Sequence, residues 1–492
     1  MSSIFETDVK VDLLADTAVL RTKELMAQSD KLRDRREKAN RKRVARLFKD
    51  PKAIEATITL TDEVMRISSV KSSSRIFRRA AKKASITGFG PLNGIGLHAI
   101  GVLSHALPTP VVAAVHQRVR ALSKDLILAS EVEKLSKHMG KRSDKGIALN
   151  INVLGEAVLG DHEAELRFQS ILEMMRRPEV NYISVKLSSI VAQLIIIDVE
   201  GSITRVSEKM RILYREAQQH GVFVNLDMEE YRDLPMTVAA FMRVLDEPEF
   251  ESMKAGIVLQ AYLPESHKFF AQLVDWSKAR YARSGGTIKV RLVKGANLAM
   301  ERAEAELHGW SSAPYRSKSD VDASYVRLVD AALRPEHSKA VRIGIASHNL
   351  FHMTWALEVA KSRGVVDQID IEMLEGMANA EALAVTRAGQ PVLLYAPVTR
   401  KDDFAAAVAY LVRRLDENTS DENYLKAAFE ISKNPAKFKE QEERFLKSIA
   451  ERHTITTESL RHIEHGLTTG HDFENERNAD PTEPHFIEAV SK

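Results

Sequence analysis

The 492-residue sequence contains no cysteine. This absence excludes disulfides, cysteine-ligated zinc, thiolate nucleophiles and cysteine-bound iron–sulfur clusters. The net charge is also small, because 71 Lys and Arg are balanced by 68 Asp and Glu. The chain as a whole therefore has no strong electrostatic attraction to polyanions. The first residues, MSSIFETDVKVDLL, lack the basic-then-apolar layout of a secretory signal. We therefore expect a cytoplasmic protein that binds no nucleic acid.

Charged side chains are absent from residues 84–117, ASITGFGPLNGIGLHAIGVLSHALPTPVVAAVHQ. The run is long enough to span a bilayer, yet it contains Asn93, three histidines, several glycines and three prolines. We expect a buried helical hairpin, or a surface that contacts lipid at the inner face of the plasma membrane, rather than a true span. Its glycines are a weak match to a phosphate loop, because no Gly-Lys-Ser/Thr follows them.

Residues 1–140 are predicted to be helical throughout, and they include a heavily basic segment at 31–50, KLRDRREKANRKRVARLFKD. We interpret this segment as a solvated helix face; the alternative is contact with anionic lipid or nucleic acid. No helix-turn-helix or ribbon-type DNA-binding motif accompanies it, which favours the first interpretation. A polar stretch at 136–146, SKHMGKRSDKG, marks a boundary.

Beyond this boundary, short β-branched runs alternate with longer amphipathic segments such as SEKMRILYREAQQH. The eight runs begin at Ile147, Tyr182, Val222, Ala255, Thr287, Val341, Val366 and Pro391. This alternation predicts a parallel sheet, and eight repeats favour a closed (β/α)8 barrel over an open doubly wound sheet. We predict an α/β fold in three parts: a helical N-terminal arm region at 1–140, the barrel at 141–430, and a helical tail with a shortened linker at 431–492.

Enzymes with this type of barrel place their active sites at the carboxyl ends of the strands. The predicted strand ends carry Lys186, Asp227, Gln260, Arg291, Lys294, Ser347, His348, Asn349, Glu372 and Tyr395, and the helix after the last strand carries Arg413, Arg414 and Glu417. Each of these alone could be part of an ion pair that closes the barrel. Together they predict a mouth with an excess of cations, which suits a carboxylate substrate and a phosphate-bearing cofactor.

Some of these residues indicate particular roles. Arg413 and Arg414 could grip a small carboxylate bidentately while Lys186 neutralises it from across the barrel. Gly295 would let the backbone approach a cofactor closely, because glycine has no side chain. The Ser-His-Asn cluster at 347–349 could bond phosphate or ribose.

Two other chemistries are disfavoured. A catalytic Ser-His-Asp triad is not predicted, because the sequence has no Gly-x-Ser-x-Gly. His348 and His352 have the four-residue spacing of helical metal ligands, but no third ligand follows at a telling interval, so we predict no metal. The residues by themselves indicate a cofactor-dependent barrel enzyme that acts on a small anion.

Eight motifs then occur in a definite order: SVKLS (184–188), NLDMEE (225–230), VLQAY (258–262), RLVKGA (291–296), SHN (347–349), LEGM (374–377), YAPV (395–398) and YLVRRLDEN (410–418). They resemble the proline dehydrogenase family, and in particular the proline dehydrogenase half of bifunctional proline utilisation A, over about residues 145–420. RLVKGA and YLVRRLDEN are highly specific in combination, whereas SHN alone carries no information.

The resemblance implies a noncovalently held FAD at the barrel mouth. It implies oxidation of L-proline to Δ1-pyrroline-5-carboxylate by hydride transfer to the flavin N5, which is the first step of proline catabolism to glutamate. Lys186, Arg413 and Arg414 would bind the proline carboxylate, and Tyr395 and Leu374 would pack on its ring. The catalytic residues would be Arg291, near the flavin N5, and Asp227, which would orient Lys186 and one of the two arginines by ion pairing. The implied FAD contacts also include Met228, Val258, Gln260, Lys294, Gly295, Ala296, Ser347, His348, Asn349, Glu417 and, by a looser alignment, Lys318.

The chain departs from the family pattern directly after RLVKGA. Many relatives carry Tyr and Trp there, where this chain has Asn297 and Leu298. That tyrosine packs beside the proline ring and limits substitution at its fourth carbon. We therefore expect Asn297 to weaken proline affinity and to admit 4-hydroxyproline, and we expect the missing Trp to remove an aromatic wall near the flavin.

The resemblance also implies partners. A membrane quinone would accept the electrons, and the end of the chain, FENERNADPTEP, resembles the lead-in to an aldehyde dehydrogenase domain that acts on glutamate semialdehyde. We expect either that domain or a separate protein with its activity as a partner, and the sequence leaves a homo-oligomer open. Three alternative functions are an inactive barrel scaffold, a hydroxyproline-preferring dehydrogenase, and an aldolase-type barrel in which Lys294 forms a Schiff base.

Overall fold

A closed parallel barrel forms the centre of the fold. The computed structural model describes residues 3–6, 8–155, 158–400, 404, 406–419, 422–461, 478–483, 486 and 489. Its strands are β1 (Leu128–Ala129), β2 (Ile147–Val153), β3 (Tyr182–Lys186), β4 (Phe223–Asp227), β5 (Ala255–Gln260), β6 (Ile288–Val293), β7 (Val341–Ala346), β8 (Ile369–Leu374) and β9 (Val392–Thr399). The sheet order is β1-β9-β2-β3-β4-β5-β6-β7-β8, and β9 also pairs with β8, which closes the ring of β2 to β9.

All eight predicted strands are therefore confirmed, and the predicted barrel is confirmed with them. The prediction that residues 1–140 are helical throughout is wrong at Leu128–Ala129, which form β1 beside the carboxyl end of β9. A two-residue strand is too short to show an alternating pattern, so the sequence carried no signal for it.

Helices precede, alternate with and follow these strands. The helices before the ring are α1 (Val9–Asp12), α2 (Leu14–Leu32), α3 (Arg35–Phe48), α4 (Pro51–Thr61), α5 (Glu63–Arg66), α6 (Val70–Lys83), α7 (Ile86–Phe89), α8 (Pro91–Leu103), α9 (Pro108–Ser123) and α10 (Val132–Ser143). Those between and after the strands are α11 (Asp161–Met175), α12 (Leu187–Ile190), α13 (Val199–His220), α14 (Leu234–Leu245), α15 (Ser266–Ser284), α16 (Leu298–His308), α17 (Lys318–Ala332), α18 (Leu350–Ser362), α19 (Asn379–Arg387), α20 (Ala406–Thr419), α21 (Tyr424–Ala428) and α22 (Pro435–Glu451). The 3-10 turns are η1 (Ser3–Phe5), η2 (Tyr231–Asp233), η3 (Pro335–His337) and η4 (Val366–Gln368).

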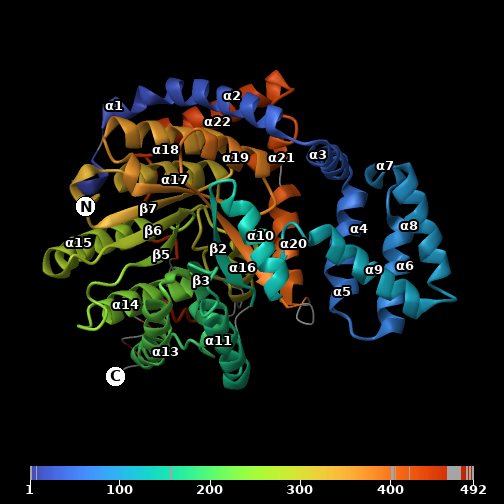
Figure 1. Cartoon of the computed structure of the whole chain (residues 1–492), viewed down its shortest axis with the longest axis horizontal. Coiled ribbons are helices and arrows are strands. Elements are labelled where there is room, and N and C mark those ends of the chain that lie inside the picture. Colours follow the sequence, from blue (N-terminus) through green and yellow to red (C-terminus); the bar gives the residue numbers. More distant parts are fainter. Residues whose placement is uncertain are drawn as a thin grey trace, which may run out of the picture. The chain divides into compact units, whose positions relative to one another are not determined.

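Local sequence signals explain where these helices begin and end. Helix α13 starts after Asp198, whose carboxylate accepts the backbone N–H of Gly201 at 3.0 Å, and it stops at Gly221 with φ of 66°. A carboxylate at the N-cap and a left-handed glycine at the end satisfy backbone groups that the helix itself leaves unpaired. Within this region, α15 covers the sheet beside β5 and β7, and α14 packs on both α13 and α15 (Figure 1).

The chain divides into two compact units. Unit 1 comprises Met1–Arg21, Glu156–Glu372 and Glu443–Lys492, and unit 2 comprises Thr22–Gly155 and Met373–Glu442. Unit 1 holds β3 to β7 and most of β8, whereas unit 2 holds the other strands and the helices α3 to α10. The segment limits at residues 140 and 430 stay predictions.

In unit 2, the uncharged residues 84–117 form α7, α8 and the first part of α9. The expectation of a buried hairpin is wrong in one respect, because large apolar side chains of α8 such as Ile95 and Val102 are 58% and 77% exposed. Of the helices in the described ranges, none has both the length and the apolar character that a membrane crossing requires.

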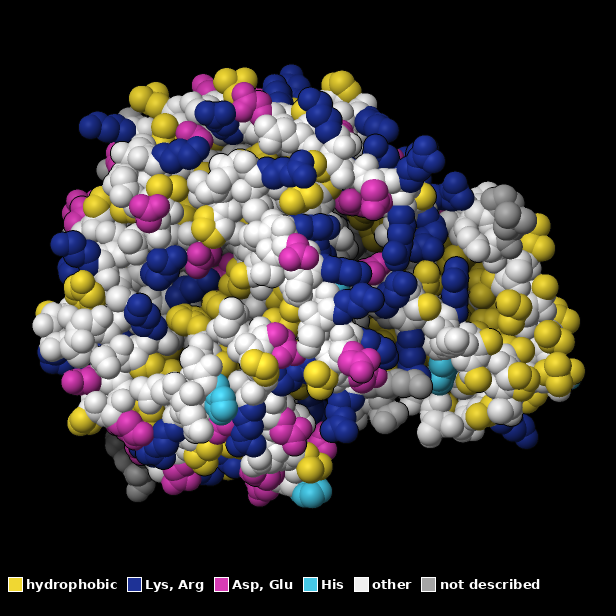
Figure 2. All heavy atoms as spheres, in the orientation of Figure 1, with side chains coloured by type: hydrophobic (Ala, Val, Ile, Leu, Met, Phe, Trp, Pro, Cys, Tyr) yellow, Lys and Arg dark blue, Asp and Glu magenta, His cyan; other side chains and the backbone are white. Residues whose placement is uncertain are grey.

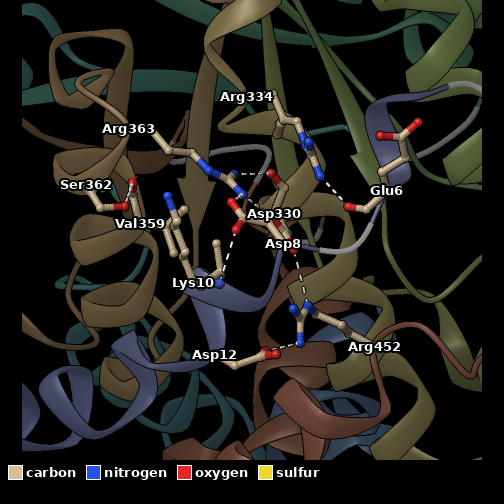
Figure 3. Close-up of polar contacts among 12 residues, drawn as sticks. Glu6, Asp8, Lys10, Asp12, Asp330, Arg334, Val359, Ser362, Arg363 and Arg452 are labelled. Carbon is tan, nitrogen blue, oxygen red and sulfur yellow. Dashed lines mark hydrogen bonds and ion pairs between the residues drawn. The ribbon is translucent and has the colours of Figure 1, made fainter.

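The N-terminal segment of unit 1 is held by a buried ion network. Asp330 on α17 accepts hydrogen bonds from Arg363 at 2.6 Å and from Arg452 at 3.2 Å (Figure 3). The same two arginines reach the N-terminal segment, where Arg363 bonds Asp8 at 3.0 Å and Arg452 bonds Asp12 at 2.5 Å. Asp330 and Arg452 are both 2% exposed, so their charges depend on partners within the network for counter-charge.

We predict that Asp330→Asn destabilises the chain by about 3–5 kcal/mol, because it leaves two arginines short of a carboxylate in a buried site. The midpoint of thermal unfolding should fall by several degrees relative to the wild type. The control is Asp275→Asn on the exposed side of α15, which should leave the midpoint unchanged. Equal midpoints for the two variants would show that the network contributes little.

Candidate active site

The interior of the barrel is polar. In unit 1, the residues Ser184, Lys186, Asn225, Asp227, Gln260, Lys289, Arg291, Asp370 and Glu372 occupy alternate positions of β3 to β6 and β8. The positions between them hold buried Val, Ile, Leu and Met side chains, which fits the two-residue period of a strand. Arg291 on β6 bonds Ser184 on β3 at 3.2 Å, and since β3 and β6 are not neighbours in the sheet, this bond crosses the interior.

Arg291 lies at the centre of a buried chain of charges. It forms an ion pair with Asp227, and its other side lies 3.7 Å from Glu372. Glu372 forms an ion pair with Lys289 at 2.7 Å, and Lys289 also lies 2.9 Å from Asp370. Burial alone would lower the pKa of Lys289, but Glu372 and the other nearby groups outweigh it and keep that pKa above its ordinary value. This chain of charges keeps Arg291 charged and in one orientation.

A glycine makes room for this chain. A Cβ on Gly344 of β7 would lie 2.3 Å from an oxygen of Glu372 and 3.0 Å from the side chain of Lys289. Any larger residue would displace the carboxylate, so the ion pair between Glu372 and Lys289 depends on glycine at this position.

A second group surrounds Glu229, directly after β4. Its carboxylate accepts from Lys186 at 2.7 Å, and its backbone oxygen accepts from Asn297 at 3.1 Å and from Gln260 at 3.3 Å. Asn297 is buried, and Gln260 donates to the backbone oxygen of Met228 as well, at 3.4 Å. We expected Asp227 to orient Lys186; the structure gives Lys186 a bond to Glu229 and Asp227 a bond to Arg291. A role for Glu229 was not predicted from the sequence, although Glu229 is part of the NLDMEE motif.

A third group joins two predicted lysines through one carboxylate. Asp322 on α17 accepts from Lys294 at 2.5 Å and also pairs with Lys318. The amine of Lys294 lies 3.0 Å from Nδ1 of His352, whose other nitrogen lies 3.3 Å from the hydroxyl of Ser448. Asp322 was also missed, although its spacing of four residues from Lys318 on a helix is the usual signal for such a pair.

The pKa values of this group follow from burial and charge. Burial lowers the pKa of the Lys294 amine to about 7, although the carboxylate of Asp322 opposes the shift. Burial alone would raise the pKa of Asp322, but Lys294 and Lys318 outweigh it and hold that pKa below its ordinary value. Burial, with the charge of Lys294, keeps the pKa of His352 well below its usual range. Asp322 is therefore ionised and His352 neutral near pH 7.

Two of the motifs have local structural roles. Gly295 has φ of 133°, and a Cβ there would lie 2.4 Å from the ring of Tyr262, so the close approach that this glycine permits is to an aromatic side chain. In the Ser-His-Asn cluster, the hydroxyl of Ser347 accepts the N–H of Asn349 at 3.0 Å, and Asn349 caps α18 by accepting the N–H of Phe351 at 3.0 Å. His348 precedes this helix, so the helical spacing expected for His348 and His352 does not exist.

Of the remaining predicted residues, Val258 is buried on β5 and Ala296 is exposed before α16, both in unit 1, and the others belong to unit 2. Tyr395 lies near the middle of β9 and Leu374 ends β8, and both are half-buried. Arg413 and Arg414 lie on α20, where the guanidinium of Arg414 lies 5.2 Å from the ring centre of Tyr410. Glu417 falls on the same helix, but its side chain lies outside the described residues.

The charges of unit 1 do not give the cation excess that we expected. Lys186, Lys289, Arg291, Lys294 and Lys318 each lie against a carboxylate, and these carboxylates are Glu229, Glu372, Asp370, Asp227 and Asp322. Five cations therefore meet five anions. Carboxylates of this kind position the cations, and an anionic ligand would have to compete with them.

An acidic side chain next to this site has a raised pKa. Glu301 on α16 is 3% exposed and accepts the backbone N–H of Tyr231 at 2.7 Å. Burial raises the pKa of Glu301 to about 7, and Glu304 and Glu230 add to the shift, while the Tyr231 N–H and Arg461 oppose it. Within the described parts of the chain, no group of three or more His, Asp and Glu side chains is arranged to hold a metal ion.

The closed parallel barrel and the polar groups that gather at its strand ends define a (β/α)8-barrel protein with the site layout of an enzyme. A sequence profile of proline dehydrogenase matches residues 135–427, which is more than half of the chain. The chain belongs to the proline dehydrogenase family, as its motifs predicted.

Individual relatives agree with this membership. The bifunctional protein PutA of Escherichia coli (strain K12) is 24% identical over 329 residues, which cover 63% of this chain and 24% of PutA. Proline dehydrogenase 2 of Bacillus subtilis (strain 168) is 25% identical over 284 residues, which cover 57% of this chain and 80% of that enzyme. This chain thus spans about a quarter of the length of the bifunctional relative.

Solved structures of proline utilization A are also similar. The protein from Corynebacterium freiburgense is 46% identical with a TM-score of 0.67, and the match covers 76% of this chain and 36% of that one. The protein from Bdellovibrio bacteriovorus has a TM-score of 0.76 at 24% identity, over 96% of this chain and 47% of that one. The second likeness concerns the fold alone.

We predict that Glu301→Gln stabilises the chain most at alkaline pH. A carboxyl whose folded pKa is raised to about 7 loses stability as the pH rises from about 4.5 through 7, because the folded state resists its ionisation. Glutamine keeps the acceptor for the Tyr231 N–H and removes this loss. The gain over wild type should be about 1–3 kcal/mol at pH 8 and close to zero at pH 4.5.

Thermal unfolding at several pH values measures this difference. The exposed Glu306→Gln on the same helix is the matched control and should show no pH-dependent gain. A gain for Glu301→Gln that is the same at both pH values would contradict the assignment.

Proposed function

We propose that the barrel oxidises L-proline to Δ1-pyrroline-5-carboxylate with a noncovalently held FAD, as the first step of proline catabolism to glutamate. One observation carries the proposal: the residues that match the proline dehydrogenase profile, 135–427, include the strands and helices that bear Lys186, Asp227 and Arg291 and their polar partners. The similarity to the Bacillus subtilis proline dehydrogenase supports the same reaction.

The described residues fit FAD in two respects. Lys294 and Lys318 converge on Asp322, so a phosphate group there would meet two ammonium groups. The side-chain oxygen of Gln260 is buried and accepts no hydrogen bond within the described part of the chain, so an N–H of a bound flavin would satisfy it. FAD, when bound, supplies the acceptor for the hydride that leaves the substrate. The further expected contacts at Val258, Met228, Gly295, Ala296, Ser347, His348, Asn349 and Glu417 stay predictions.

The protein's own residues would perform three tasks. Arg291 would place a fixed cation beside the reacting atoms, where negative charge develops during the reaction, and Asp227 would hold that cation in place. Lys186 would bind the substrate carboxylate, which would displace the carboxylate of Glu229 from it. Arg413 and Arg414 would complete the carboxylate site, and Tyr395 and Leu374 would pack on the ring.

The contacts of Lys294 favour this chemistry over a Schiff base. A Schiff-base lysine needs a deprotonated amine that a carbonyl carbon can reach. The pKa of about 7 meets the first condition, but Asp322 at 2.5 Å and His352 at 3.0 Å obstruct the approach of a carbonyl carbon to the amine. An inactive scaffold is also disfavoured, because Arg291, Lys294 and both arginines of α20 are retained.

The proposal includes partners for the electrons and for the product. We propose that a membrane quinone accepts the electrons and that an aldehyde dehydrogenase domain or protein consumes glutamate semialdehyde. The bifunctional character of the Escherichia coli relative supports the second partner. A cytoplasmic location at the inner face of the plasma membrane would suit the first.

We expect the purified chain, supplied with FAD, to show a yellow flavin spectrum that bleaches when L-proline is added without oxygen. Bleaching follows from hydride transfer, because reduced flavin loses its visible absorbance. A protein that is colourless after unbound FAD has been removed, or whose bound flavin does not respond to proline, would overturn the proposal. Borohydride trapping of a carbonyl substrate would instead support the Schiff-base alternative.

The same assay tests the substrate site. Lys186→Met should lower kcat/KM for proline by about 10- to 100-fold, because it removes one charged hydrogen bond to the carboxylate. Lys268→Met, at an exposed position on α15, is the control and should keep full activity.

We predict that the wild type also oxidises 4-hydroxyproline and that Asn297→Tyr shifts the preference towards proline by about tenfold. The larger ring would fill the space beside the fourth carbon of the substrate. Asn297→Ala is the control, because it keeps the space open and should leave the ratio of the two kcat/KM values near that of the wild type. If the wild type does not oxidise hydroxyproline at all, this prediction is wrong.

A further inference from the structure

Helix α8 of unit 2 carries most of its described large apolar side chains on the outside, while Leu97 packs inward against a buried cluster that includes Phe77 of α6. Six of the nineteen exposed large hydrophobic side chains among the described residues fall between residues 86 and 107. They are Ile86 at 44% exposure, Ile95 at 58%, Ile100 at 43%, Val102 at 77%, Leu103 at 48% and Leu107 at 49%, and we call them the apolar α8 face. Figure 2 shows hydrophobic side chains gathered over α7 and α8, at the right of the view.

The inward side of α8 explains this arrangement. A Cβ on Gly94 would lie 2.6 Å from the Cα of Ile86, and a Cβ on Gly101 would lie 2.8 Å from the Cβ of Ala81 on α6. Ser104 is fully buried, and its backbone oxygen accepts from the hydroxyl of Ser74 at 2.9 Å. Small residues therefore let α8 pack closely on α6 and α7, and Ile95, Ile100, Val102 and Leu103 remain facing outward. A helix on the surface of a globular protein normally has the opposite polarity.

Basic residues adjoin this face. Residues 63–126, from α5 to just after α9, contain ten Lys and Arg but only two Asp and Glu, a balance of +8 in a chain whose total is +3. Helix α6 contributes Lys71, Arg75, Arg79 and Lys82 at exposed positions. Arg78 of the same helix lies 3.4 Å from the backbone oxygen of Ser104, at the end of α8. The positive charge is thus on the helix that packs directly against α8.

Length and charge together indicate what covers the face. A 13-residue helix is about 20 Å long, shorter than the hydrocarbon core of about 30 Å, so α8 suits the plane of a bilayer surface rather than a crossing. Exposed apolar side chains with Lys and Arg beside them are the signature of an interfacial helix, and anionic headgroups complement the +8 balance. A symmetric pair of chains would bring two basic regions together, which disfavours a second copy.

We propose that the apolar α8 face and the basic residues of α6 form a docking surface for an anionic lipid bilayer. The side chains of the face enter the headgroup boundary, while Arg75, Arg79 and Lys82 lie against lipid phosphates. This surface lies wholly within unit 2 and does not rest on the proposed oxidation, because lipid binding and turnover are measured separately.

Co-sedimentation of the full chain with vesicles tests the proposal. Vesicles of phosphatidylcholine with about 30 mol% phosphatidylglycerol should pellet the wild type, and pure phosphatidylcholine should bind it about tenfold less well or weaker. The double variant Ile95→Glu and Val102→Glu should lose at least about tenfold in affinity for the anionic vesicles. Arg75→Gln, Arg79→Gln and Lys82→Gln together should abolish the preference for phosphatidylglycerol.

The matched control is the double variant Leu166→Glu and Leu307→Glu, which changes two side chains on α11 and α16 that are 52% and 79% exposed. It should bind the vesicles as the wild type does. Thermal unfolding shows whether each variant is folded, and since all the changed side chains are exposed, we expect unchanged midpoints. Flavin reduction by proline is followed in parallel, so failure of the lipid test and failure of the proposed function are distinguishable.

Three results would overturn the proposal. The wild type could fail to pellet with anionic vesicles, the Ile95 and Val102 variant could pellet as the wild type does, or binding could be indifferent to phosphatidylglycerol. A mass that rises with protein concentration, and returns to that of one chain in the Ile95 and Val102 variant without any lipid binding, would assign the face to a second copy instead.

Discussion

The ion pair between Asp227 and Arg291 is the interaction on which the barrel interior depends. It joins β4 to β6 across the intervening β5, so it forms only if the sheet curves and the two strands keep their register. Glu372 and Lys289 extend the pair into a chain, and Gly344 leaves the room that this chain occupies. Loss of one partner from a buried pair costs several kcal/mol, because a charge is left without its counter-charge. The sequence of the strands is thus constrained on both faces, by apolar packing outside and by charge balance inside.

Much of this architecture could be predicted. The eight strands of the ring have strong β-branched runs, and a strand in a closed parallel barrel keeps that pattern whatever its neighbours are. The strand-end residues could be predicted for the same reason, because parallel strands bring all their carboxyl ends to one side.

The ion pairs that these residues form could not be predicted. Whether Lys186 meets Asp227 or Glu229 depends on side-chain directions at the end of a strand, and a difference of two residues is invisible to periodicity. Asp322 lies on a helix and far along the chain from RLVKGA, so strand-end reasoning passed over it.

The misjudged hairpin has a different cause. Apolarity in a sequence shows that side chains avoid water, but it does not show which side of a helix faces the protein. In α8 the decisive residues are Gly94, Gly101 and Ser104, whose small size allows close helix packing and turns Ile95 and Val102 outward. The same few residues distinguish a helix with an exposed apolar face from an ordinary helix whose apolar face is buried in the core. Gly94 and Gly101 are seven residues apart and Ser104 follows three residues later, and this spacing in the sequence would have been a usable signal.

The network around Asp330 ties a residue near the beginning of the chain to one that is 440 positions further on, since Arg452 bonds Asp12. During synthesis this contact must wait until the chain has grown by the 440 positions that separate the two partners. At about 5–20 residues per second, the wait lasts roughly 20 to 90 seconds. By the end of that time β3 to β8 have been produced, while the N-terminal segment still lacks the arginine that neutralises Asp12. Closure of this network is therefore a late event, and the N-terminal segment is fixed only after the strands of the barrel have been made.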